Sequence, residues 1–127
     1  MRFFFLIFLV VLVSCAEQKS DCSGLVAQIS NDHIRWDGNF LGLQVSSMGE
    51  AEQRVLSCGS ACRPLLIAAL ADKSRFIAAH VLLTKMQNGS IQLSAAEWNH
   101  LKVMLHADGR VEIPAGQQAE IQSLWSK

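Results

Sequence analysis

Three cysteines in the body of the chain, Cys22, Cys58 and Cys62, carry the side chains best suited to covalent chemistry. Three cysteines allow three pairings, and each pairing leaves one thiol over. Residues four apart in one continuous helix are too distant for a relaxed disulfide, whose Cβ atoms lie about 3.8 Å apart, but the Gly59-Ser60 break could bring Cys58 and Cys62 together. The pattern therefore leaves open a Cys58–Cys62 bond, a bond from Cys22 to one of the other two, or three buried thiols.

The four histidines, His33, His80, His100 and His106, have no spacing typical of a metal site. No His-x-x-x-His or Cys-x-x-Cys pair is present, and two histidines six residues apart on one strand, as at 100 and 106, are about 20 Å apart. His80 falls in an almost entirely apolar run, where we expect a core histidine with a hydrogen-bond partner. The sequence therefore predicts no bound metal and no cofactor.

The chain also lacks the motifs of familiar enzyme classes. The run from Cys58 to Cys62 is one residue longer than the Cys-x-x-Cys of redox enzymes, and it lacks the second glycine of a Gly-x-Ser-x-Gly turn. No glycine-rich phosphate loop is present, and the carboxylates are scattered singly. We predict no catalytic residues and no enzymatic activity; the alternative is a small enzyme that uses His80 or a free cysteine.

The N-terminus has the organisation of an export signal. Met1-Arg2 provides a positive start, and residues 3–13 are all apolar. Eleven residues make about 16 Å of helix, well short of the hydrocarbon core of about 30 Å, so the segment has the length of a signal-peptide core. It ends in Leu12-Val13-Ser14-Cys15, which resembles the lipobox of bacterial lipoproteins.

That resemblance implies a lipid anchor on Cys15, with the peptide cut before this residue and acyl chains attached to it. Several acyl chains on one residue suffice for a stable anchor, which a single chain does not provide. The following Ala16 favours the outer membrane, facing the periplasm, if the host is Gram-negative. The implied organisation is a signal peptide over residues 1–14, a tether over 15–20 and a single domain over 21–127.

The elements that must position these side chains follow from turn and periodicity signals. Asp-Gly pairs predict two hairpins, one with strands 33–36 and 39–45 around Asp37-Gly38, and one with strands 101–105 and 110–113 around 107–109. Helices are expected over 21–30, from a capping box at Ser47 to 57, over 60–72 with Pro64 in the first turn, over 73–87, and over 115–125, with a short turn at 94–98.

The core of the domain is expected to be mainly helical. The third of the longer helices is apolar on nearly every face around residues 76–83, so it must be covered on more than one side. Trp36, Trp98 and Trp125 are expected to anchor the core or the hairpins, and a ligand-binding face is the alternative. The fold class is therefore α+β.

The helices of residues 51–86 are similar to a HEAT-type repeat. The similarity is carried, in order, by Gly59, Pro64-Leu65-Leu66, Leu70-Ala71-Asp72, Arg75, Ala78-Ala79 and Leu83. Only about one and a half units are present, whereas a solenoid needs about three or more repeats. The resemblance therefore implies antiparallel HEAT-like helices flanked and capped by the two hairpins and a C-terminal helix.

Composition narrows the function further. The chain has 127 residues, a formal net charge of zero and 50% hydrophobic residues, which suits one small domain with a core and gives no electrostatic footprint for nucleic acid. HEAT-like helix pairs serve mainly in protein recognition. The sequence thus predicts an envelope lipoprotein, bound to the membrane through Cys15, that acts as a protein-binding or scaffolding module.

Overall fold

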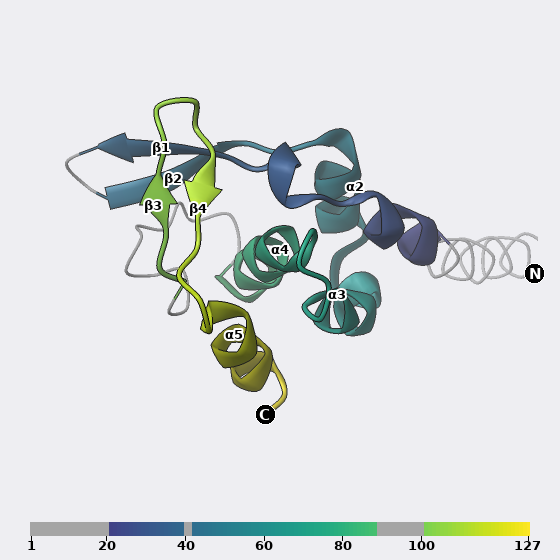
Figure 1. The fold of residues 1–127 in the computed structure, drawn as a ribbon. Coiled ribbons are helices and arrows are strands. Elements are labelled where there is room, and N and C mark those ends of the chain that lie inside the picture. The colour runs from purple at the N-terminus through teal and green to yellow at the C-terminus, as the bar shows by residue number, and fades with distance from the viewer. Residues whose placement is uncertain (1–20, 40–41, 89–100) are drawn as a thin grey trace, which may run out of the picture.

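A computed structural model of the chain describes residues 21–39, 42–88 and 101–127 (Figure 1). The predictions for Cys15, the signal peptide, the tether, Trp98 and His100 lie outside the described residues. The fold is α+β, as predicted. Its elements are a helix over residues 21–28, η1 (Asn31–His33), β1 (Arg35–Asn39), β2 (Gly42–Ser47), α2 (Glu50–Cys58), η2 (Gly59–Cys62), α3 (Arg63–Ala69), α4 (Phe76–Asn88), β3 (Met104–Leu105), β4 (Val111–Glu112) and α5 (Gln117–Trp125).

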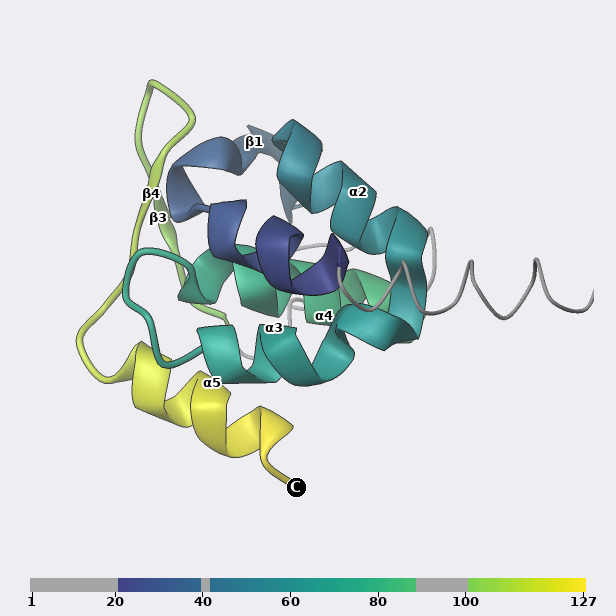
Figure 2. The same cartoon turned by 90° about the vertical axis from the view of Figure 1, so that its right-hand side faces the viewer.

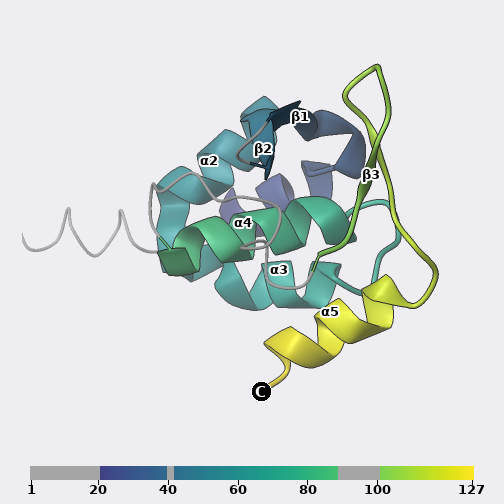
Figure 3. The ribbon, with the colours of Figure 1, turned by 90° about the vertical axis from the view of Figure 1, so that its left-hand side faces the viewer.

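Helix α4 forms the centre of the domain, and every residue from 76 to 84 in it is buried. It packs against both α2 and α3. Figure 2 shows the helix over 21–28 lying between α2 and α3 on one side of α4, and Figure 3 shows α4 from the opposite side. The prediction that this apolar helix is covered on several sides is confirmed.

The first hairpin is present, but its predicted turn is wrong. Asp37 and Gly38 lie inside β1, where they pair with Gln44 and Leu43 of β2. The strands pair through both residues as far as Asn39 and Gly42, so the connection falls at residues 40–41, outside the described part. Gly38 lies close to the second hairpin, since a Cβ there would lie 3.3 Å from the Cδ2 atom of Leu105.

The second hairpin is confirmed as the short antiparallel pair of β3 and β4. It lies across the first hairpin, and the backbone N–H of Trp36 donates a 3.1 Å hydrogen bond to the carbonyl of Gly109. Figure 1 shows both hairpins on one side of the molecule, with α2, α3 and the helix over 21–28 on the other. Trp36 of β1 is buried, as expected of an anchor.

The predicted starts of α2 and α3 differ from the structure. Gly49, not Ser47, precedes α2, because Ser47 is still paired in β2 and a side chain at 49 would collide with Glu52. Gly59 ends α2 with a φ of 66°, as its predicted stop requires. The chain then makes the 3-10 turn η2 before α3, which has Pro64 in its first turn as predicted but begins at Arg63 instead of residue 60.

The turn between α3 and α4 is held by Asp72. Its carboxylate accepts hydrogen bonds from the backbone and hydroxyl of Ser74 and from Nε of Arg75, so residues 73–75 form a turn and α4 begins three residues later than predicted. Asn31 then caps α4 from a remote segment, since its Oδ1 accepts from the backbone N–H groups of Ile77 and Ala78.

We expect Asp72 to make stability depend on pH in the acid range. The hydroxyl and backbone of Ser74, followed by Arg75, lower the pKa of the Asp72 carboxyl from 3.8 to about 2. A lowered folded-state pKa stabilises the fold above the unfolded value, and this contribution disappears as the pH falls toward about 2. In thermal melts, Asp72→Asn should therefore lower the midpoint at pH 7, and its difference from wild type should narrow between pH 3.8 and about 2. A constant difference across that range would show that the carboxylate charge plays no part.

Candidate functional site

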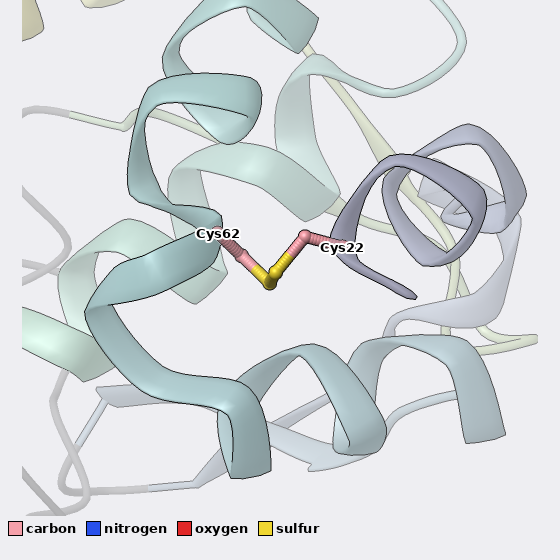
Figure 4. Close-up of a disulfide and its surroundings, with 2 residues drawn as sticks. All are labelled: Cys22 and Cys62. Atoms are coloured by element: carbon pink, nitrogen blue, oxygen red, sulfur yellow. A yellow bond between two sulfur atoms is a disulfide. The ribbon is translucent and has the colours of Figure 1, made fainter. Parts of the chain in front are cut away.

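The cysteine cluster consists of Cys22, Cys58 and Cys62. These residues lie on the helix over 21–28, on α2 and on η2, which come together in the helical part of the domain. Cys22, on the helix over 21–28, is bonded to Cys62 of η2, with their Cα atoms 5.2 Å apart (Figure 4). Both residues are fully buried, together with Leu25 and Leu66, in the main core. Of the arrangements left open by the sequence, a bond from Cys22 is therefore the one formed, because packing of the first helix brings it beside η2.

Cys58 is the third member of this cluster, and its thiol is free. It is the last residue of α2, half-buried against the core. The sulfur atoms of Cys22, Cys58 and Cys62 all lie within 4.8 Å of one another. The Cys58–Cys62 alternative is not formed, but the chain break at Gly59 does bring the two sulfurs close, as the sequence suggested.

His80 lies in the core, as expected. It is fully buried in α4, and its Nδ1 accepts a 2.9 Å hydrogen bond from the indole Nε1–H of Trp125. The two ring centroids are 5.9 Å apart in an edge-on arrangement. Because Nδ1 is the acceptor, the proton of the neutral ring is on Nε2. This contact fixes α5 to α4, and the Arg63 guanidinium lies 5.3 Å from the centroid of the same indole ring.

The hydrogen bond between these rings makes a double-mutant prediction. His80→Leu removes the acceptor and leaves the indole N–H of Trp125 in an apolar setting, which should cost about 1–3 kcal/mol of unfolding free energy. In a Trp125→Phe background, which has no N–H to leave unpaired, the same substitution should cost less, by about 1 kcal/mol. Urea denaturation of the four proteins measures the coupling. Equal costs in both backgrounds would show that this hydrogen bond does not stabilise the domain.

A buried carboxylate, Glu52 of α2, was not predicted from the sequence. Its Oε1 accepts hydrogen bonds from the backbone N–H of Ser30, at 2.9 Å, and from Nδ1 of His33, at 2.8 Å. Glu52 lies three residues before the buried Val55, so both residues are on the inward face of α2. This spacing is the feature of the sequence from which the burial of Glu52 could have been predicted. The pair ties the segment after the first helix to α2, and the His33 side chain remains partly exposed.

Arg75, one of the residues that carry the sequence resemblance to a HEAT repeat, is engaged within the fold. Its Nε donates to Asp72, and its Nη1 donates a 3.1 Å hydrogen bond to the carbonyl of Val26. The arginine thereby links the first helix to the turn between α3 and α4. Reversing its charge would disturb this link, so Arg75 is a poor probe of partner binding.

Exposed apolar side chains gather on the second hairpin. Met104 is 56% exposed and Leu105 41% exposed, whereas Leu65 of α3, also a large exposed hydrophobic residue, is 37% exposed. The hairpin is bordered by polar groups, including His106, whose Nε2 lies 3.3 Å from an Oε2 oxygen of Glu112. We call Met104 and Leu105 the hairpin patch.

Within the described ranges, none of the helices combines the length and apolar character needed to cross a bilayer. Comparisons with protein-family models, with curated proteins and with solved structures give no match for this chain.

Proposed function

We propose that this chain is an exported lipoprotein, anchored through acyl chains on Cys15, whose domain binds another protein at the cell envelope. The observation that carries the proposal is the Cys22–Cys62 disulfide, which begins seven residues after Cys15. Disulfides persist in oxidising compartments outside the cytosol, which is where a lipobox would direct the chain. In a Gram-negative host, the domain would face the periplasm from the outer membrane.

The disulfide also determines how the domain would be attached to its membrane anchor. Cys22 follows Cys15 by seven positions, with six residues between them, and seven extended residue steps span at most about 25 Å. Cys22, two residues after the end of the tether, is bonded to Cys62 of η2 and is not only packed against the core. The domain is therefore held close to the bilayer, and a pull on the tether is transmitted to the helical layer without unravelling the first helix.

The hairpin patch is the surface that we propose for partner binding. Burial of exposed apolar side chains supplies most of the favourable free energy of protein association, and the fully buried centre of an interface is more apolar than its rim. Met104 and Leu105 lie on a hairpin that is joined to the first hairpin by the backbone hydrogen bond from Trp36 to Gly109. The HEAT-like character of the helices, implied by sequence resemblance, supports the same class of function.

Site-specific photocrosslinking in intact cells tests this proposal. A photoreactive residue at position 104 of the full chain should give an adduct with a partner protein, and Leu105→Lys should abolish that adduct. The same photoreactive residue at the exposed Ser123 of α5 is the matched control and should give none. Melting curves establish that the variants are equally stable, and immunoblots of the cells establish equal abundance.

Two outcomes would count against this proposal. One is the absence of any adduct at position 104 that is sensitive to Leu105→Lys. The other is loss of the cellular phenotype in His80→Gln while Leu105→Lys has no effect at equal folded abundance. The second result would favour the alternative of a small enzyme, although burial of His80 against Trp125 supports a structural role.

A further inference from the structure

The free thiol of Cys58 lies directly beside a disulfide that solvent does not reach. Cys22 and Cys62 are fully buried, whereas Cys58 is partly exposed, and all three sulfurs lie within 4.8 Å of one another. Thiol–disulfide exchange requires a thiolate that can reach a disulfide sulfur. Small-molecule thiols in solution lack that access here, so Cys58 is the thiol best placed to attack.

We propose that Cys58 is the attacking thiol of an internal disulfide exchange. Cys58 loses its proton to solvent, and its thiolate forms a new S–S bond to Cys22 or Cys62. The original bond breaks, and the displaced sulfur leaves as a thiolate that takes up a proton. One disulfide and one thiol are present before and after, so the step needs no external oxidant or reductant.

The surrounding structure allows this exchange without loss of the fold. Gly59 follows Cys58 with a positive φ, so the attacking residue sits at a break in the helical backbone. The first helix is also held by contacts that do not involve sulfur. Its Leu25 is buried in the core, and the carbonyl of Val26 accepts a hydrogen bond from Arg75. Breaking the Cys22–Cys62 bond would therefore leave this helix in place.

The two products would have different consequences for the chain. Bonding of Cys58 to Cys22 keeps the N-terminal segment attached covalently, now to the end of α2. Bonding of Cys58 to Cys62 releases Cys22, so that the N-terminal segment is held by packing alone. At this cluster the disulfide that attaches the N-terminal segment can thus move from Cys62 to Cys58 or be lost from Cys22. This holds whether or not Cys15 is lipidated.

Locating the free thiol by mass spectrometry tests the exchange. The full chain is incubated without denaturant at pH 5, 6, 7 or 8.5, quenched with acid, alkylated and fragmented to locate the label. Label should move from Cys58 to Cys22 or Cys62, and it should move faster at higher pH because exchange proceeds through a thiolate. The rate should not depend on protein concentration.

A displaced thiol provides the matched control. In Cys58→Ser combined with Ser57→Cys, an exposed thiol stands one position away on α2, and its label should stay at position 57. Incubation of the wild-type chain in urea shows that the assay detects scrambling when the chain unfolds. Label confined to Cys58 in the folded wild type at pH 8.5, or movement that depends on protein concentration, would overturn the proposal.

Discussion

Removing the Cys22–Cys62 disulfide by the double substitution Cys22→Ala and Cys62→Ala is expected to lower the unfolding free energy by about 4 kcal/mol. The two cysteines are 40 residues apart, and a cross-link that closes a loop of this length restricts the unfolded chain by about that amount. Small domains are stable by only about 5–15 kcal/mol, so the change is a large share of the total. Urea denaturation monitored by tryptophan fluorescence gives the value.

The matched control for this experiment is Cys58→Ala. It removes a half-buried thiol but leaves the disulfide intact, so its cost should be about 1 kcal/mol or less. Equal urea midpoints for the double variant and the wild type would mean that the bond adds nothing to stability. A cost for Cys58→Ala as large as that of the double variant would instead assign the stabilising role to the third cysteine.

Leu66→Ala and Leu83→Ala are each expected to cost about 2–5 kcal/mol. Both leucines are fully buried, Leu66 on α3 and Leu83 on α4, and the two helices pack against each other. Truncation removes apolar contacts and leaves a cavity that the surrounding helices fill only in part. Urea denaturation measures the loss of unfolding free energy, provided that the slope of this free energy against urea concentration is the same for each variant and the wild type.

A neighbouring leucine on the same helix distinguishes burial from helix propensity. Leu65 of α3 is 37% exposed, so Leu65→Ala should change stability by well under the cost of Leu66→Ala. Alanine is a good helix former at both positions, so the difference reports packing. Shifts below about half a kcal/mol for both Leu66→Ala and Leu83→Ala would show that the packing of α3 on α4 is misassigned.

Local signals identified most of the elements of the fold. Gly59 ends α2 and Pro64 lies in the first turn of α3 because these residues restrict the backbone wherever they occur. The all-round apolar character of α4 likewise required a central position. The Asp37-Gly38 turn was wrong because both residues pair within the hairpin, where Leu105, a residue far along the chain, also lies close to Gly38. A contact between residues so far apart in the chain cannot be predicted from the local sequence.

The candidate site was predictable in its members but not in its pairing. The three cysteines could be named from the sequence, but the choice of Cys62 for Cys22 depends on how the first helix packs into the core. Glu52 was missed for a related reason. A charged residue on a helix is ordinarily solvated, and only the approach of Ser30 and His33 from another segment makes its burial favourable.

The mass of the mature N-terminus tests the proposed anchor most directly. Chain recovered from the membrane fraction and cut with trypsin gives a terminal peptide that ends at Lys19. We predict that this peptide begins at Cys15 and carries acyl chains on that residue, and that Cys15→Ser leaves the precursor uncut. An unmodified mature N-terminus at any residue other than Cys15 would contradict the proposal.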